Sequence, residues 1–143
     1  MHQPPEWPPK PPSFFIGFDL GQKHDHTAIA VLERVAVPTG EFDHTYGAPV
    51  IRPDLHVRHA ERLPLNTSYP AVAERLASLC RSMQLRGHPV TVVVDATGVG
   101  TPVLDALRRE RLPATILPVS ITSGGMPSYA NGVDRIPKAD LLT

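Results

Sequence analysis

The pattern of apolar and polar positions at the start of the chain predicts a β-hairpin. Residues 14–37 are rich in aromatic and β-branched side chains, and a short polar break at Gly21–His26 divides them. This arrangement is typical of two antiparallel strands joined by a turn. We expect the first strand to begin at Phe14 and the second to run from Thr27 to about Val35.

The pattern is less regular between this hairpin and the first helix. Residues 38–54 are rich in Pro, Gly, Asp and His, and we expect them to form a loop. Residues 55–65 alternate between apolar and polar side chains, which is typical of a half-exposed strand. A helix is predicted from Tyr69 to Leu85, because apolar side chains recur there at helical spacing and Gly87 provides a stop signal.

The second half of the chain predicts strands that alternate with helices. Residues 90–94 form a continuous β-branched run, which is typical of a strand buried on both faces. We expect a helix at 101–111, a strand at 114–121, a polar loop at 123–132 and the opening of another helix at 137–138. The predicted fold class is α/β, with a mixed sheet that is antiparallel at first, then parallel, and is flanked by helices.

Composition and charge limit the class of protein. The 143-residue chain has 41% hydrophobic and 20% charged residues, which is typical of one globular domain. Fourteen basic residues balance fourteen acidic ones, so net charge favours no particular partner. No apolar segment approaches the roughly 20 residues of a membrane span, and we expect a cytoplasmic protein without a membrane partner. The single cysteine, Cys80, excludes an internal disulfide and is expected to be a core residue.

The first residues differ in composition from the rest of the chain. Six of the first twelve residues are prolines, which neither a helix nor a central strand accepts. We therefore predict an extended, proline-rich leader at residues 1–13 and a folded domain at residues 14–143.

Two aspartates, Asp19 and Asp95, are the main candidates for chemistry. Asp19 lies in an apolar strand pattern, where a carboxylate needs a compensating partner, and Asp95 ends the most apolar strand. Functional sites in α/β sheets form at the carboxyl ends of such strands. Two carboxylates brought together there would repel each other unless a cation held them, and oxygen ligands suit Mg²⁺ or Mn²⁺. A pair of such ions can cleave a phosphodiester, so we predict a two-metal site.

The segments around both aspartates resemble a known family. FFIGFDLGQKHDHTAIAVLERV (14–35) and VTVVVDATGVGTPVLDALRR (90–109) are similar to the nuclease domain of phage large terminase subunits and related prophage proteins, as are LPVSITSGG (117–125) and RIPKADLL (135–142). The resemblance implies a ribonuclease-H-like fold and metal-dependent cleavage of double-stranded DNA during genome packaging. The chain contains no phosphate loop ending in Gly-Lys-Ser/Thr, so a packaging ATPase or a portal protein would be a separate partner.

The resemblance also implies roles for individual residues. Carried over by motif, Asp19 and Asp95 would be catalytic metal ligands. The family has a further acidic ligand in a His-Asp-Asp type segment on a late helix, and these 143 residues contain no such segment. Asp140 is kept as a candidate third ligand and Lys138 as a candidate nucleic-acid contact. We therefore expect a partial nuclease domain, either a fragment or a prophage remnant.

Two other functions stay open, and two other motifs have simpler explanations. The actin-like ATPase fold shares the hairpin opening, and the segments at 19–31 and 95–100 vaguely resemble its phosphate loops. A non-catalytic remnant that keeps the fold would cleave nothing. The His-Asp-His sequence at 24–26 is explained as a solvated turn, because no cysteine or third histidine stands at ligand spacing. Asp105 is expected to form a solvated ion pair with the arginines at 108 and 109.

Overall fold

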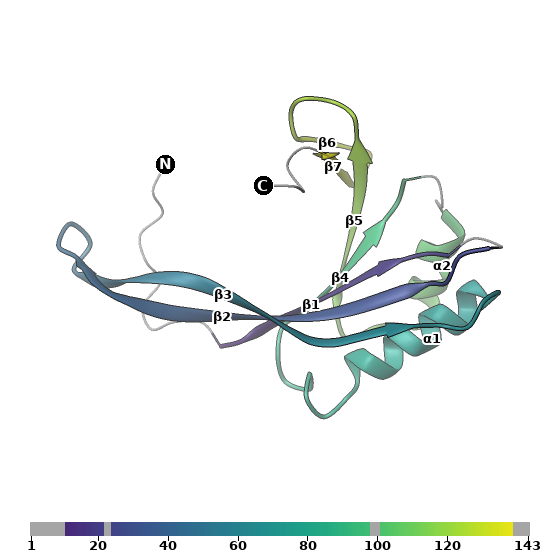
Figure 1. Cartoon of the computed structure of the whole chain (residues 1–143), viewed down its shortest axis with the longest axis horizontal. Coiled ribbons are helices and arrows are strands. Elements are labelled where there is room, and N and C mark those ends of the chain that lie inside the picture. Colours follow the sequence, from purple (N-terminus) through teal and green to yellow (C-terminus); the bar gives the residue numbers. More distant parts are fainter. Residues whose placement is uncertain (1–10, 22–23, 98–100, 139–143) are drawn as a thin grey trace.

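Seven strands in the described part of the chain, residues 11–21, 24–97 and 101–138 of this computed structural model, form one mixed sheet (Figure 1). The strands are β1 (Ser13–Asp19), β2 (Ala28–Asp43), β3 (Ala48–Arg62), β4 (Val90–Asp95), β5 (Thr115–Thr122), β6 (Ser128–Ala130) and β7 (Val133–Pro137). Their order across the sheet is β3-β2-β1-β4-β5-β7-β6. β1, β2 and β3 pair antiparallel, whereas β1, β4, β5 and β7 pair parallel. The predicted α/β class and mixed sheet are confirmed, and the order is compatible with a ribonuclease-H-like fold.

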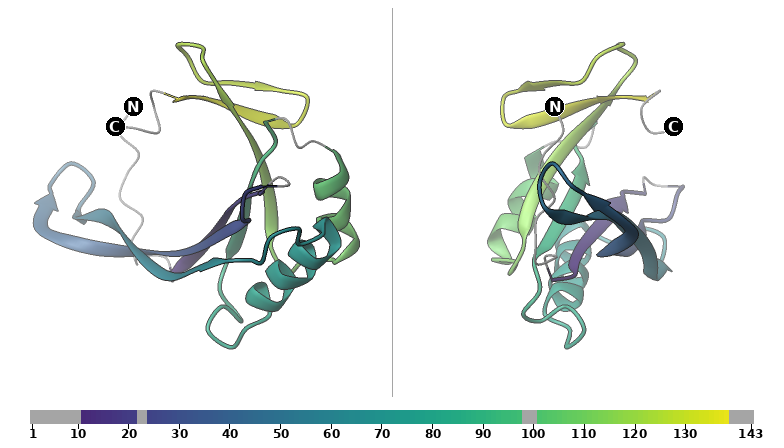
Figure 2. Two further views of the ribbon diagram at one scale, coloured as in Figure 1. Left: turned by 45° about the vertical axis from the view of Figure 1, so that its right-hand side comes forward. Right: turned by 90° about the vertical axis from the view of Figure 1, so that its left-hand side faces the viewer.

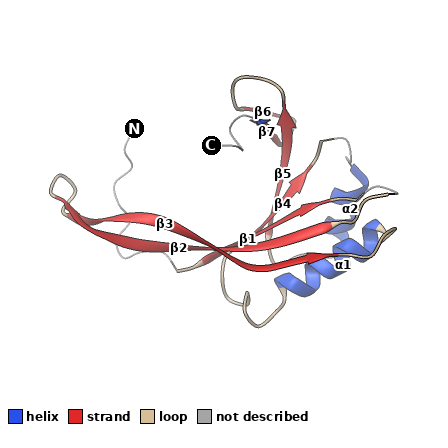
Figure 3. Cartoon of the chain, viewed as in Figure 1, coloured by secondary structure: helices blue, strands red, loops and turns tan. Residues whose placement is uncertain are grey.

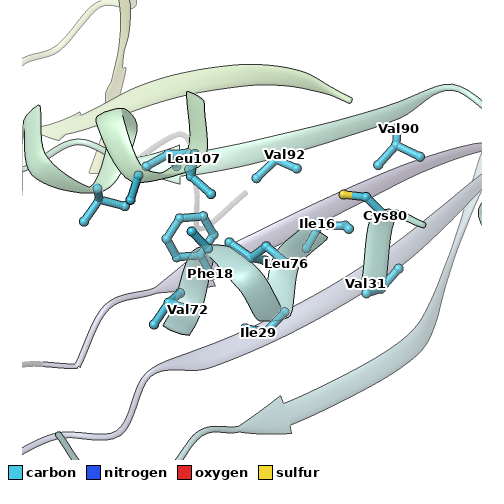
Figure 4. Packing of buried hydrophobic residues seen from close by; sticks show 14 of the residues in the cluster. Ile16, Phe18, Ile29, Val31, Val72, Leu76, Cys80, Val90, Val92 and Leu107 are labelled. Atoms are coloured by element: carbon cyan, nitrogen blue, oxygen red, sulfur yellow. The ribbon is translucent and has the colours of Figure 1, made fainter. Parts of the chain in front are cut away.

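One face of the sheet forms the hydrophobic core. Two helices, α1 (Tyr69–Cys80) and α2 (Thr101–Arg109), contact each other and cover this face (Figures 2 and 3). Leu76 of α1 and Leu107 of α2 are fully buried there, beside Ile16 of β1 (Figure 4). The alternation along the strands produces this burial, because every second side chain points to the helix face.

β4 differs from its prediction in one respect. Val90, Val92 and Val94 are buried against the helices, but Thr91 and Val93 on the other face are only half-buried. The continuous apolar run therefore does not mark burial on both faces. In the described residues both helices lie on the same side of the sheet, so the second face of β4 keeps access to solvent.

The first helix begins where the sequence predicts and ends earlier. The Ser68 hydroxyl accepts a hydrogen bond from the N–H of Ala71 at 3.3 Å, which caps the helix. α1 ends at Cys80 instead of Leu85. Beyond Cys80 the backbone forms turns with hydrogen bonds between residues three apart, such as the one from the N–H of Ser82 to the carbonyl oxygen of Leu79. Leu85 is nevertheless buried, which explains why the apolar pattern continued past the helix. Cys80 is buried, as predicted, and burial raises the pKa of its thiol.

The predicted loop at 38–54 is wrong for most of its length. β2 and β3 continue through this segment as a two-stranded arm that extends beyond β1, with pairs from Val35↔Asp54 to Asp43↔Ala48 (Figure 1). The prolines that suggested a loop lie in the edge strand β3 or in the part of β2 that pairs on one side only. Strands that pair on one side only tolerate proline, because half of their N–H groups belong to no ladder.

The predicted loop at 123–132 and the predicted helix opening at 137–138 are also wrong in part. β6 and β7 form a hairpin whose two-residue turn is Asn131-Gly132, with φ of 53° and 76°. An Asn-Gly pair is the strongest short signal for such a turn, and the sequence interpretation did not use it. β7 runs to Pro137, so a strand occupies the first of the two positions where a helix was expected, whereas Lys138 is in 3₁₀-helical conformation.

Leu76→Ala is expected to lower the free energy of unfolding by about 2–5 kcal/mol, because it leaves a cavity between α1 and the sheet. Urea denaturation followed by circular dichroism would measure the change. Met83→Ala is the control, since Met83 is 84% exposed, and its effect should stay within about 0.5 kcal/mol. Equal losses in the two variants would contradict the position of the core.

Candidate metal centre at the carboxyl ends of β1 and β4

Asp19 and Asp95 end two neighbouring parallel strands. β1 and β4 pair in register from Phe14↔Val90 to Phe18↔Val94, and one further step along both strands brings Asp19 beside Asp95. Laterally adjacent residues in a parallel pair point to the same face of the sheet. Both aspartates therefore lie on the face opposite the buried Phe18 and Val94.

This second face, called the open face below, leaves both carboxylates accessible. Asp19 is exposed and Asp95 is half-buried. No ion pair to either aspartate is found within the described ranges. Two adjacent carboxylates without a neutralising cation repel each other, which favours binding of a positively charged ligand between them.

The donor set fits a hard divalent cation. Mg²⁺ is usually bound through one or two carboxylates, with waters and substrate phosphates completing an octahedron. Asp19 and Asp95 could supply those carboxylates. Among the residues that the structure describes, no group of three His, Cys, Asp or Glu side chains could hold a metal ion. The described part of the site is therefore a two-carboxylate site, and Asp140 lies outside the described residues.

A third acidic side chain, Asp134, lies on the same row of the open face. Asp95 pairs with Val119 of β5, and Val119 pairs with Asp134 of β7, so one strand separates the two acids. The sequence analysis missed Asp134 because its place depends on β7, which was not predicted. Lys138 is exposed and lies four residues beyond this row, so the structure does not bring it beside the aspartate pair.

A shallow hollow of about 640 Å³ borders Asp19 on the open face. Its floor consists of small residues from three strands, because Gly17 pairs with Ala30 and Ala30 pairs with Ala60. A methyl group added to Gly17 would meet nothing within 4 Å, so packing inside the chain does not require glycine at this position. Arg62, which is exposed, lines the hollow. The backbone of a ligand could therefore approach the sheet closely beside Asp19.

The His-Asp-His turn at 24–26 contributes no cluster of metal ligands in the described part of the chain. All three side chains are exposed, and Nδ1 of His26 lies 2.8 Å from the carbonyl oxygen of Leu63. The buried Thr27 accepts a hydrogen bond from the N–H of Gly21, which ties the turn to the start of β2. Asp105 pairs with Arg108 at 3.4 Å, as predicted, on α2.

The opposite face carries a polar cluster that joins β3 to α1. Glu61 accepts a hydrogen bond from Nε of Arg75 at 2.8 Å, and Nε2 of His59 lies 3.4 Å from the same oxygen. Burial raises the pKa of Glu61, but the hydrogen bond and charge of Arg75, with a smaller contribution from His59, outweigh it and lower the pKa. The cluster connects the edge strand to the helix, and among the described residues no hydrogen bond or ion pair joins it to Asp19 or Asp95.

A second hollow, of about 630 Å³, lies on the helix face beside the end of α1. Its floor includes Leu79 and Leu85, and its charged side chains, Glu33 and Arg58, form an ion pair with each other. It contains neither aspartate. This hollow is not the candidate site of chemistry, because the charges of Glu33 and Arg58 neutralise each other.

Comparisons with known proteins found no match: no family model, no curated protein and no solved structure matches this chain. No helix in the described residues is long and apolar enough to cross a membrane. The functional class therefore rests on the fold, the register of the aspartates and the sequence motifs.

Glu61→Gln should reduce stability in a pH-dependent way. A lowered pKa in the folded state means that ionised Glu61 stabilises the fold above its unfolded pKa of about 4.3, and this stabilisation disappears as pH falls through the folded pKa. Denaturation at pH 7 should show a loss of about 0.2–1 kcal/mol, because the pair is partly exposed. The difference from wild type should shrink below about pH 4. Glu74→Gln, exposed on α1, is the control, and an identical pH profile for both variants would contradict the role of Glu61.

Proposed function

We propose that this chain is a metal-dependent DNA endonuclease domain of the terminase type, in which Asp19 and Asp95 hold Mg²⁺ or Mn²⁺. One observation carries the proposal: two carboxylates lie side by side at the carboxyl ends of adjacent parallel strands, on the face without helices in the described residues. The substrate class, double-stranded DNA during phage or prophage packaging, comes from the resemblance of both aspartate segments to terminase nuclease domains.

Asp19 and Asp95 would bind the metal ion from different sides. Asp19, which is exposed, would bind the ion from the side of the hollow, and Asp95 would bind it from β4. The bound ion would supply an activated water and would stabilise the leaving oxygen of the phosphodiester. Repulsion between the two carboxylates, which opposes their approach in the free protein, would favour binding of the ion.

The hollow beside Asp19 provides a place for the DNA backbone. Its floor of Gly17 and alanines lets a phosphate approach the sheet, and the guanidinium of Arg62 can form paired hydrogen bonds with phosphate oxygens. Such contacts position the backbone without reading sequence. A separate packaging ATPase or portal protein would bring the DNA to this face.

Asp19→Ala and Asp95→Ala should each abolish Mn²⁺-dependent nicking of a supercoiled plasmid, because the loss of either carboxylate removes charge and a fixed ligand position from the ion site. Mn²⁺ should raise the melting temperature of the wild type, and this shift should shrink in both variants. We expect slow nicking by the wild type, since two carboxylates are few for a two-metal centre.

Asp105→Ala is the matched control for this experiment. It removes an acid that is paired with Arg108 on α2, and nicking should persist. Nicking by either site variant at the wild-type rate would disprove the ligand assignment. Calorimetric binding of ATP without any Mn²⁺-dependent cutting would instead favour the actin-like ATPase interpretation.

Gly17→Val should reduce DNA cutting at least tenfold while leaving the Mn²⁺-induced shift in melting temperature intact. Valine suits a central strand, its Cβ would meet nothing within 4 Å, and Gly17 lines the hollow into which the side chain would extend. Ala36→Val, an enlargement on β2 outside the hollow, should leave cutting unchanged. If Gly17→Val cuts DNA normally, the backbone of the substrate does not lie in the hollow.

A further inference from the structure

Two short hydrogen bonds attach the loop that follows β4 to β5. The N–H of Ala96 donates to the carbonyl oxygen of Val119 at 2.7 Å. The N–H of Ile121 donates to Oγ1 of Thr97 at 2.8 Å. The first bond is formed by two backbones and survives most substitutions, whereas the second depends on the side chain of Thr97.

Thr97 also contacts the carboxylate of Asp95. Its N–H donates to Oδ1 of Asp95 at 2.7 Å, at the short end of the range for such bonds. This contact occupies one carboxylate oxygen and leaves Oδ2 as the freer of the two. In the described part of the chain, no comparable hydrogen bond to the Asp19 carboxylate is found, so the two acids differ in how firmly they are held.

We infer that Thr97 is the positioning residue for Asp95. Its hydroxyl, held by the N–H of Ile121, keeps its own N–H against Oδ1 and so sets the direction in which Oδ2 meets a divalent ion. Thr97 is exposed, so burial does not fix its conformation and the hydroxyl contact must do so. This inference rests on the proposed metal site.

The expected size of the effect follows from other metal sites. Residues that orient a ligand without binding the ion typically change metal affinity 10–100-fold when they are replaced. The ligand itself stays in Thr97 variants, and the N–H that contacts Oδ1 belongs to the backbone. We therefore expect the low end of this range, roughly tenfold.

Thr97→Val tests the inference, because valine keeps the shape and the backbone N–H but removes Oγ1. The dissociation constant for Mn²⁺ alone, measured by electron paramagnetic resonance where every variant is folded, should rise roughly tenfold. Thr97→Ser should restore wild-type affinity, and Thr97→Ala should repeat the loss if the valine variant folds poorly. Ser120→Ala removes a hydroxyl that lies 3.5 Å from Thr97 Oγ1, and Mn²⁺ affinity should stay unchanged.

The outcomes separate this inference from the proposed function. If the wild type binds Mn²⁺ and cuts DNA but Thr97→Val binds Mn²⁺ equally well, the positioning role is wrong and the metal site stands. A lower melting temperature of the ion-free variant with unchanged Mn²⁺ affinity would assign Thr97 a purely structural role and would also overturn the inference. If the wild type binds no Mn²⁺, both the proposed function and the inference fail.

Discussion

The parallel pairing of β1 with β4 is the constraint on which the rest of the structure depends. Ile16 and Val92 are fully buried partners in this register, and their burial fixes which side chains face the helices. The same alternation sends Asp19 and Asp95 to the other face at the same level. A slip of one residue in either strand would turn one acid into the core, so the hydrophobic core and the candidate site are set by one interaction.

The one-sided cover of the sheet leaves this candidate site open. α1 and α2 bury one face, while the β2–β3 arm and the β6–β7 hairpin extend from opposite edges (Figure 2). In the described residues, no helix covers the face that carries the aspartates and the hollow. For the proposed nuclease function, a DNA duplex could reach the carboxylates without displacing any of the described helices or strands.

The two candidate ligands are held to different degrees. Asp95 is half-buried, and the backbone of Thr97 holds one of its oxygens, whereas Asp19 is exposed at the end of β1. In the proposed metal site, one fixed and one adjustable ligand would define a direction for the ion and would still accommodate a change in geometry when a phosphate binds. Metal affinity would then depend on the preorganisation of Asp95, and therefore on the loop after β4.

The elements that could be predicted from the sequence are those whose pattern reflects local burial: the hairpin opening, the strands β1 and β4, the start of α1, and the placement of Asp19 in β1 and Asp95 at the end of β4. Apolar side chains recur every second residue in a half-buried strand and every three to four residues in an amphipathic helix, so the sequence alone predicts these features. The length of the β2–β3 arm and the position of Asp134 could not be predicted from the sequence. The arm forms because its two strands pair with each other despite their prolines, and Asp134 reaches its place only through the pairing of β7 with β5. The hollow beside Asp19 could not be predicted from the sequence either, because Gly17, Ala30 and Ala60 lie side by side only when β1, β2 and β3 pair in register.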